Sequence, residues 1–497
     1  YKYERLAGSR EEFPSDALTD MEAGSTSGAG YTNGAGSSEY KMLSYFARVN
    51  YTLMDRYLFE VNMRADASSR FHKDHRWGYF PSFSAGWRMS EESFMKDIEW
   101  INNLKIRASY GTLGNINNVG NYDYFQNYSS GNHYNFSDSP VIGIGESKPA
   151  NETLGWEKVA LTDIGLDFDI FNGLLGVTAD YYIKNTSDIL LGYNVPTETG
   201  ITAAPSQNIG KVKNTGFELA LNHRNKIGAV NYSIGANIAT NKNKITNLGG
   251  SDNIIQTSSY IVKYILKKGE SIGSFYGFKT DGLYTQADID AGHYYTLSGV
   301  VPNAGDIKFV PQRDIEYKQE ITDEDRTILG KDVPDFTYGV NLSLQYKGFE
   351  FSMFGQGISG TKVAFDVYGV HPFYHGQDSP RKYHLKRWTE ENPNPHAAYP
   401  RIYSASSVHT TYNRNFSDYH LFDSDYFRFK TLSLGYTVPS ATVKNWGLQS
   451  LKVYVTGENL FTVRADKKME DFDPETAGGV IYTLGTKSVA FGVNISF

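Results

Sequence analysis

The strongest constraint on the fold of this chain is a two-residue alternation of apolar and polar side chains. In the last ten residues, SVAFGVNISF, every second position is apolar: Val489, Phe491, Val493, Ile495 and Phe497. The positions between them hold serine, alanine, glycine and asparagine. Side chains that alternate in this way lie on opposite faces of a β-strand. The end of the chain is therefore predicted to be a strand with one apolar and one polar face.

The same alternation recurs along the chain, for example at 56–66, 174–185, 231–240 and 335–349. In these segments the second face carries charged, amide and hydroxyl side chains, as expected of a wall that is wet on one side. A soluble β-sandwich or propeller, in which the apolar faces pack on a core, is the alternative to a membrane-spanning wall.

The lengths of the connections separate these alternatives. Short connections are predicted at 54–56, 171–174, 223–228 and 346–349. Long ones, rich in Gly, Tyr, Asn, Asp and His, are predicted at 116–152, 190–206, 285–335, 365–420 and 464–486. Short turns at one end of the strands and long loops at the other are typical of outer-membrane barrels, and a sandwich has no reason to keep its long loops on one side. We therefore predict an all-β fold, a transmembrane antiparallel β-barrel with long extracellular loops and short periplasmic turns.

We expect about fifteen strands in this chain. Their predicted starts lie near residues 40, 56, 79, 103, 156, 174, 208, 229, 256, 272, 335, 348, 424, 450 and 487. The strand near 256 is the least regular. It is nevertheless required, because only with it do all long connections fall at one end of the strands and all short ones at the other. Because single-chain bacterial barrels have even strand numbers, an odd number predicts further strands upstream. Residues 1–39 are then expected in an extracellular loop, and 40–497 as the C-terminal portion of a larger barrel.

The composition excludes several classes of protein. The 497 residues contain no cysteine, which rules out a disulfide-stapled secreted domain, thiolate metal sites and cysteine nucleophiles. The net charge of −7 argues against nucleic acid as the main partner. No segment resembles a nucleophile elbow, a phosphate-binding loop or a pair of catalytic carboxylates. We therefore expect a protein that is not an enzyme.

Read in order, the sequence motifs resemble one family, the SusC/RagA-like TonB-dependent transporters of Bacteroidetes outer membranes. The resemblance extends over almost the whole chain and rests on the joint order of the motifs rather than on any one of them. The segments that carry it are SYFARVNYTLMDRYLFEVNMRADASSRF (44–71), WGYFPSFSAGWRMSEESF (77–94), LKIRASYGTLGN (104–115), LGWEKVALTDIGLDFDIFNGLLGVTADYYIKNTSDILL (154–191), NIGKVKNTGFEL (208–219), GESIGSFYGFKTDGLY (269–284), YFRFKTLSLGYTVP (426–439), VYVTGENLFTV (453–463), DFDPE (471–475) and the final FGVNISF.

The resemblance implies a barrel of 22 strands, of which about fifteen would lie in this chain. The family's plug domain, signal peptide and TonB-contacting segment have no counterpart in this sequence and would lie on an upstream portion of the transporter. The resemblance also implies a SusD-like surface lipoprotein as a lid, TonB as a partner reached through that upstream portion, and outer-membrane lipid around the barrel. The terminal Phe497 resembles the aromatic residue that the barrel-assembly machinery recognises.

The implied function is TonB-dependent import of oligosaccharides or oligopeptides across the outer membrane of a Gram-negative bacterium of the Bacteroidetes type. We consider two rivals. A passive outer-membrane porin or adhesin barrel would work without TonB. A secreted β-rich protein that binds or hydrolyses carbohydrate would be soluble without detergent, and a hydrolase would need a carboxylate pair.

The candidate substrate-binding residues lie in NYDYFQNYSSGNHYNF (121–136), which is dense in aromatic side chains. Aromatic faces stack on sugar rings and on peptide side chains, and tyrosines add hydroxyl contacts. Packing within the loop and contact with a partner are the alternatives for the same residues. The candidates are Tyr122, Tyr124, Phe125, Tyr128 and Tyr134.

Six of the eleven histidines lie in or beside the loop at 365–420. Closely spaced histidines occur in zinc sites, but no acidic partner stands in register here, and Pro372 disfavours a helix. Polar contacts to a lid partner or to substrate are the favoured interpretation. The candidate lid-contact residues are His371, Phe373, Tyr374, His375 and Trp388.

The segment DIEYKQEITDED (314–325) has the length and acidic alternation of a calcium-binding loop. Its acidic residues in that alternation are Asp314, Glu316, Glu320 and Asp325. A loop of the EF-hand type requires an oxygen ligand at its fifth position and glycine at its sixth, where this chain has Lys318 and Gln319. We interpret the segment as a solvated acidic loop and expect neither a metal nor a cofactor.

Overall fold

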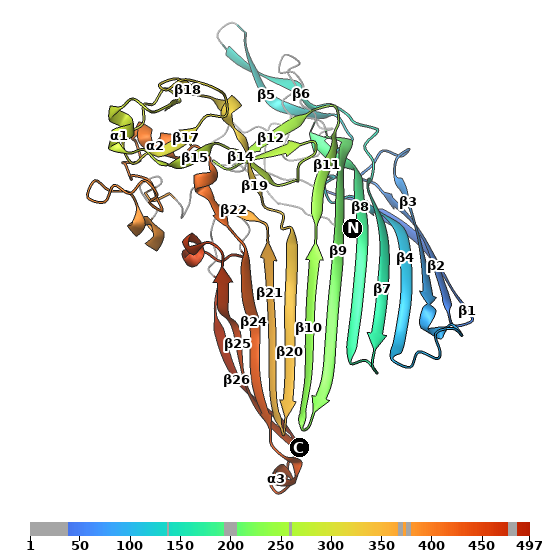
Figure 1. The fold of residues 1–497 in the computed structure, drawn as a ribbon. Helices are drawn as coiled ribbons and strands as arrows, with labels where there is room; N and C mark the ends of the chain where they lie inside the picture. Colours follow the sequence, from blue (N-terminus) through green and yellow to red (C-terminus); the bar gives the residue numbers. More distant parts are fainter. Residues whose placement is uncertain are drawn as a thin grey trace. The chain divides into compact units, whose positions relative to one another are not determined.

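Extended strands dominate the structure (Figure 1). Among the described residues, no helix is both long enough and apolar enough to cross a membrane. For residues 129–136 and 139–142 the description is limited to the backbone. The computed structural model describes residues 38–136, 139–192, 206–257, 261–365, 371–373, 379–475 and 485–497. The predicted loop at 1–39 therefore lies almost wholly outside the described residues.

Fourteen strands form the largest sheet, and their order in the sheet follows their order in the chain. Thirteen of them make one continuous path, and β11 (Lys242–Leu248) pairs with β9 beside it. The thirteen are β1 (Met42–Leu53), β2 (Tyr57–Ser68), β3 (Trp77–Arg88), β4 (Ile101–Asn115), β7 (Glu157–Ile170), β8 (Leu175–Gly192), β9 (Ser206–Ile227), β10 (Val230–Thr240), β20 (Phe336–Tyr346), β21 (Phe349–Ser359), β24 (Tyr426–Thr437), β25 (Ser450–Arg464) and β26 (Ser488–Ser496). Strands that neighbour their successors in the chain are the arrangement of an up-and-down barrel wall, so the predicted fold class is confirmed.

The chain divides into two compact units, and each is described by itself. The first comprises Tyr1–Ala85, Ala108–Thr162 and Lys184–Lys211, and the second comprises Gly86–Arg107, Asp163–Ile183 and Val212–Phe497.

The first unit contains the antiparallel pair β1–β2, in which Leu53 lies opposite Tyr57. Met54 and Asp55 turn the chain between these strands with φ values of 53° and 55°, the left-handed region that matches a turn to the twist of its flanking strands. A second pair consists of β5 (Asn127–Phe136) and β6 (Ser139–Lys148). The buried core of this unit consists of Phe71, Phe80, Val119, Leu154 and Trp156.

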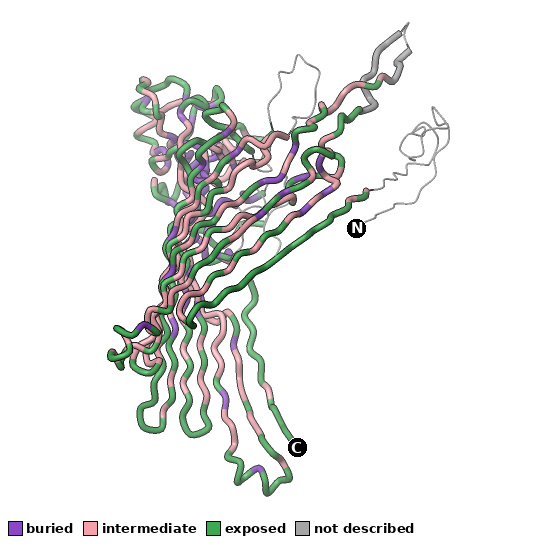
Figure 2. Tube along the Cα trace, turned by 90° about the vertical axis from the view of Figure 1, so that its right-hand side faces the viewer, coloured by how far each residue is buried: buried purple, intermediate pink, exposed green. Residues whose placement is uncertain are grey.

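In the second unit, the strand register aligns apolar side chains on one face of the sheet. One row crosses six neighbouring strands through directly opposed residues: Phe491, Val455, Leu434, Phe351, Leu344 and Tyr232. Exposed and half-buried residues line these long strands (Figure 2), and Phe491 is 84% exposed. Such a continuous apolar band on the outside of a sheet is the signature of a surface that meets lipid.

Aromatic rings gather at both ends of this band. Near the start of β24, the rings of Phe427 and Tyr338 stack at 6.0 Å, and Phe429 contacts Phe461 at 6.4 Å. At its other end, Tyr436 packs on Phe349 at 4.6 Å. From Phe427 to Tyr436 the strand covers about 30 Å, which is about 23 Å along the membrane normal at a tilt of about 40°. This spacing matches the apolar height of an outer membrane, which is about 25 Å and is flanked by aromatic girdles.

The long connections of the second unit fold into a body of their own, residues 253–257, 261–331, 361–365, 371–373 and 379–423, which we call the loop body. Its four-stranded sheet consists of β12 (Asn253–Thr257), β13 (Lys263–Lys267), β14 (Ser274–Gly277) and β19 (Thr327–Lys331). Three smaller pairs join β15 (Lys279–Leu283) to β17 (Ile307–Val310), β16 (Thr296–Leu297) to β18 (Glu320–Ile321), and β22 (Lys362–Ala364) to β23 (Leu421–Asp423). Two short helices, α1 (Gln286–Asp290) and α2 (Val408–Asn413), complete it. Its main core contains Phe278, Leu283, Leu297, Ala304, Ile307, Phe309, Ile321, Trp388, Ala397 and Tyr412.

Two of the fifteen predicted wall strands are wrong. The segments near 256 and 272 form β12, β13 and β14 of the loop body rather than part of the large sheet. Each has five residues or fewer, whereas a membrane-spanning strand needs about 9–11. Ile265 and Phe275 are buried, so the alternation in these segments reflects packing on a protein core. Because two strands are removed together, the predicted directions of the other thirteen are unchanged.

Candidate functional site

The face of the second unit's sheet opposite the apolar row is polar. It contains a cavity of about 240 Å³. Within it, Lys452 on β25 contacts Glu350 on β21, and Ser433 Oγ lies 2.9 Å from Thr456 Oγ1. The polar lining consists of Ser343, Gln345, Glu350, Ser352, Ser433, Lys452, Tyr454, Thr456 and Asn494. Because the cation and the carboxylate pair with each other, this wall offers hydrogen bonds without a strong net charge.

Arg428 organises the polar face near the start of β24. The residue is buried, with 4% of its surface exposed. Its Nη2 lies 2.7 Å from Asp473 Oδ1, and its Nη1 lies 2.7 Å from Glu475 Oε2. Its Nε donates to Thr462 Oγ1 at 3.0 Å. Arg428 therefore ties β24 to β25 and to the segment that follows β25.

Glu475 receives donors on both of its carboxylate oxygens. Lys430 Nζ lies 2.6 Å from Oε2, the oxygen that Arg428 also contacts. Gln356 Nε2 and the Tyr426 hydroxyl donate to Oε1 at 3.2 and 3.1 Å. Although burial opposes ionisation, Lys430 and Arg428 hold the pKa of Glu475 below its usual range. With two donors on each oxygen, this carboxylate is a structural anchor.

Arg428 and Lys430 are two residues apart on β24, so their side chains lie on the same face of the sheet and both reach Glu475. The register of β24 against β25 shifts between Phe429 and Thr431, so that Lys430 has no directly opposed residue. A β-bulge of this kind re-aims the side chains around it.

A second cavity, of about 370 Å³, lies beside Glu475, and we call it the rim cavity. Small-molecule sites commonly have volumes of about 300–1,000 Å³. Its apolar lining consists of Tyr264, Phe275, Ile358, Val363 and Pro474. Its polar lining consists of Asp332, Gln356, Thr361, Lys362, Ser424, Tyr426 and Glu475. Since these residues come from β13, β14, β21, β22 and β24, the cavity lies where the wall meets the loop body.

A further charge cluster in the second unit joins β4, β7 and β8. Arg107 Nη1 lies 2.7 Å from Asp180 Oδ1 and 3.5 Å from Asp163 Oδ1, and Nε lies 3.2 Å from Asp167 Oδ2. A Cβ placed on Gly165 would come within 2.5 Å of Arg107 Cζ. The lack of a side chain at Gly165 is therefore what lets the guanidinium lie against the sheet and reach three carboxylates.

The structure brings part of the predicted aromatic set together in the first unit. The rings of Tyr124 and Phe125 stack at 4.3 Å, and Tyr122 contacts Phe125 at 6.3 Å. Tyr122, Phe125 and Tyr128 are exposed, whereas Tyr124 packs against the core. The side chain of Tyr134 lies outside the described residues. Three exposed rings thus remain on this loop as a surface for stacking.

The predicted lid-contact residues lie in different environments. His371 and Trp388 are buried inside the loop body, whereas Phe373 is exposed. Tyr374 and His375 lie outside the described residues. His371 and Trp388 therefore support the loop from inside, and in the described part of this set Phe373 is the side chain that faces outward.

Two buried histidines of this loop, His371 and His420, are uncharged at neutral pH. His371 and His420 have ring centroids 5.3 Å apart, and His371 Nδ1 lies 3.1 Å from the Tyr399 hydroxyl. Burial, together with the nearby His420, lowers the pKa of His371 well below its usual value. Burial also lowers the pKa of His420 to about 4.

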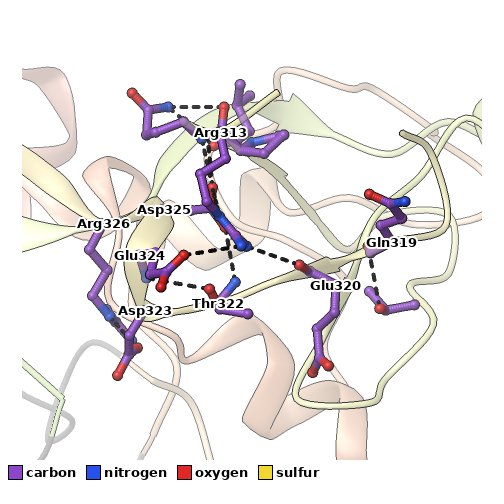
Figure 3. A network of polar contacts seen from close by, with 12 residues as sticks. Arg313, Gln319, Glu320, Thr322, Asp323, Glu324, Asp325 and Arg326 are labelled. Carbon is purple, nitrogen blue, oxygen red and sulfur yellow. Dashed lines mark hydrogen bonds and ion pairs between the residues drawn. The ribbon is translucent and has the colours of Figure 1, made fainter. Parts of the chain in front are cut away.

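Arg313 closes the acidic segment 314–325 (Figure 3). Its Nη2 lies 2.7 Å from Oδ2 of the buried Asp325, and the backbone N–H groups of Gln312, Arg313 and Thr322 donate to the same carboxylate at 3.0 Å. Although burial opposes ionisation, these hydrogen bonds hold the pKa of Asp325 at about 2. The carboxylate of Asp325 therefore stabilises the folded loop.

The other three residues of the acidic alternation, Asp314, Glu316 and Glu320, are exposed to solvent. Within the described ranges, no three His, Asp or Glu side chains are arranged to hold a metal ion.

Sequence reasoning missed the network around Arg428. The signal was present as two cations two residues apart in FRFKT (427–431) and as the carboxylates of DFDPE (471–475). Arg428 and Glu475 are 47 residues apart in the chain, so the pairing of these motifs follows from the sheet register rather than from local spacing.

The chain is similar to proteins of known family. Residues 6–460 match the family model described as TonB dependent receptor-like, beta-barrel. TonB-dependent receptor P3 of Formosa agariphila is 32% identical over 431 residues, which cover 86% of this chain and 41% of that protein. TonB-dependent receptor SusC of Bacteroides thetaiotaomicron is 29% identical over 467 residues, which cover 92% and 43%.

A solved structure adds a similarity of fold. The RagAB peptide importer in its open-open state matches with a TM-score of 0.75 and 25% identity over 97% of this chain and 50% of that one. The chain thus spans about half the length of these proteins or less. The predicted resemblance and the outer-membrane location are confirmed by these matches. Residues 6–460 match the family model and the strand topology agrees with it, so the chain belongs to the TonB-dependent receptor-like β-barrel family.

Proposed function

We propose that this chain forms the C-terminal wall and extracellular loops of a TonB-dependent outer-membrane importer of oligosaccharides or oligopeptides. The observation that supports this most directly is the sheet of the second unit, with an apolar row of exposed and half-buried side chains on one face and a polar, charge-paired face on the other. Such a wall suits lipid on one side and a hydrated passage on the other. The named relatives, a TonB-dependent receptor and a peptide importer, support the coupling and the direction of transport.

The proposed assembly includes further components. An upstream portion of the same transporter would supply the remaining strands, the plug and the contact with TonB. With thirteen wall strands in place of fifteen, nine of the implied 22 strands fall to that portion. A SusD-like lipoprotein would cover the loops, and cargo would be held between lid and barrel without covalent chemistry.

Three sets of residues receive roles in this proposal. Tyr122, Phe125 and Tyr128 present aromatic faces to cargo or to the lid, since they are exposed on one loop. Phe373 contacts the lid from the loop body. Phe497, which is 81% exposed, is the signal for barrel assembly, and its replacement by Ser should lower the amount of transporter in the outer membrane without changing uptake per molecule.

Uptake in the native bacterium tests the proposed function. The transporter would be purified in mild detergent from native outer membranes, and mass spectrometry would identify its protein partners and any retained ligand. Uptake of that ligand, in labelled form, should require both TonB and this chain. Uptake that survives deletion of TonB would favour a passive porin, and purification of the chain as a soluble protein without detergent would exclude the barrel.

A further inference from the structure

Three residues with ionisable side chains line the rim cavity, and one of them already has a full set of partners. Glu475 is held by Arg428 and Lys430 on one oxygen and by two neutral donors on the other. Asp332 and Lys362 line the same cavity. Among the described residues, neither has an ion-pair or side-chain hydrogen-bond partner, and the two do not pair with each other.

Hydrogen bonds to its backbone N–H and carbonyl hold Asp332 in place. Its N–H donates to the carbonyl of Gly273 at 3.0 Å, and the Thr361 hydroxyl donates to its carbonyl at 2.9 Å. Gly273 has a φ of 69°, and a Cβ there would collide with Asp332 Oδ1. Burial raises the pKa of Asp332, because the carboxylate has lost water without gaining a cation.

Lys362 is placed in a similar way. Its side chain crosses Gly330, where an added Cβ would lie 2.7 Å from Lys362 Cδ. Gly330 lies opposite Phe275 in the pairing of β14 with β19, and Gly273 immediately precedes β14. One glycine on β19 and one just before β14 thus provide the space for two oppositely charged side chains at the same cavity.

We propose that the rim cavity is a cargo subsite for a small zwitterion, an amino acid or a short peptide with both termini free, with its ammonium group at Asp332 and its carboxylate at Lys362. This inference rests on the proposed import function and narrows its cargo to peptides. A ligand that carries both charges complements the two opposite charges of this lining, whereas a neutral saccharide complements neither. The apolar lining, which includes Phe275, Val363 and Pro474, suits the side chain of an amino acid.

Binding of matched probes to the full transporter complex tests the subsite. The probes are trialanine, its N-acetyl form, its C-terminal amide, the doubly blocked form, and maltotriose as a neutral saccharide. Titration calorimetry should show that each block weakens binding by about tenfold, the size expected for loss of a charge-assisted hydrogen bond. Equal binding of free and doubly blocked trialanine would overturn the proposal.

Two variants separate the roles of the charges. Asp332→Asn should abolish the preference for a free amino terminus and keep the preference for a free carboxylate, and Lys362→Met should do the reverse. This crossed pattern is not produced by general misfolding. Asp314→Asn and Lys268→Met, which remove exposed charges outside the cavity lining, serve as controls and should keep both preferences.

Uptake assays distinguish failure of the subsite from failure of the import function. TonB-dependent uptake of maltotriose that both variants leave unchanged would overturn the subsite while the import function stands. If neither trialanine nor maltotriose enters in a TonB-dependent way, and no other ligand co-purifies, the import function fails and the subsite with it.

Discussion

Phe491 in the large sheet is 84% exposed, whereas Phe309 in the loop body is 1% exposed. Both residues stand in segments of alternating character, SVAFGVNIS and IKFV, and both strands belong to the second unit. The difference lies in what covers the apolar face. In the large sheet the side chains of the apolar row are exposed or half-buried, whereas in the loop body strands, short helices and loops enclose a core as they do in a soluble protein.

The two regions also use charge differently. The loop body buries the carboxylate of Asp325 in a pair with Arg313. The polar face of the wall carries half-buried cations and carboxylates that join strands of the sheet, as Lys452 on β25 and Glu350 on β21 do across β24. A fold that meets water on one side and lipid on the other can therefore be recognised by which face carries its ion pairs, more surely than by its hydropathy.

The largest expected effect is in the core of the loop body. Phe309→Ala should lower local stability by about 4 kcal/mol, because a buried phenylalanine leaves a cavity that relaxes poorly. Amide hydrogen exchange of β15 and β17 measures this local opening. Phe373→Ala, at an exposed position, is the matched control and should change exchange little. Equal effects of the two substitutions would show that the loop body has no core of its own.

A charge on the apolar face of the wall should have the next largest effect. Leu342→Arg, in the middle of β20, should lower the free energy of unfolding in lipid vesicles by about 3 kcal/mol, the cost of Arg near the membrane midplane. Ser343→Arg places the same side chain on the opposite face of the same strand and should cost much less. Denaturant titration of the folded transporter in vesicles compares them, and a reversed order would place lipid on the other face.

The network around Arg428 comes next. Arg428→Met should destabilise the segment after β25 by about 2 kcal/mol, since it leaves the carboxylates of Asp473 and Glu475 partly buried with fewer donors. Lys430→Met removes one of four donors to Glu475 and should cost less. Hydrogen exchange at residues 471–475 measures both. If Lys430→Met has the larger effect, the ammonium of Lys430 and not the guanidinium of Arg428 holds this segment.

The smallest effect is a dependence on pH that is confined to the loop body. The pKa of His420 is about 4 in the folded chain and about 6.5 in an unfolded one, so the unfolded state binds more protons between these values. Stability should therefore fall as the pH is lowered, by about 1.5 kcal/mol between pH 6.5 and pH 5 for this residue. Hydrogen exchange of β22 and β23 at the two pH values measures it.

The matched control for this pH effect is His420→Phe, which should flatten the slope. A slope that is unchanged in this variant would assign the pH dependence to His371 or to other groups.

Much of the wall could be predicted from the sequence. The thirteen strands of the path begin within two residues of their predicted starts, for example at Met42, Tyr57, Phe336 and Ser488. Period-two alternation over ten or more residues, with turns between, has few other solutions. The segments near 256 and 272 failed because alternation does not say whether an apolar face meets lipid or protein. Strand length distinguishes the two cases, because the strands formed near 256 and 272 are too short to span a membrane.

The candidate site was less predictable. The aromatic residues at 122–128 could be found because aromatic density is a local property of a sequence. The rim cavity could not, since its lining comes from five strands that are far apart in the chain. The sequence also did not show which loop residues are buried. His371 and Trp388 were predicted to contact a partner because they lie in a long loop. This loop has a core, and both residues are buried in it.

Gly165 carries a consequence for the evolution of this wall. A side chain at this position would occupy the space of the Arg107 guanidinium, so the glycine and the arginine constrain each other across two strands. Among homologous sequences, an arginine at the position of Arg107 should occur together with glycine at 165, and lineages that lose the arginine should be free to accept larger residues there. In the same lineages, acidic residues should also become less frequent at the positions of Asp163, Asp167 and Asp180. The whole cluster would then be inherited or lost as a unit.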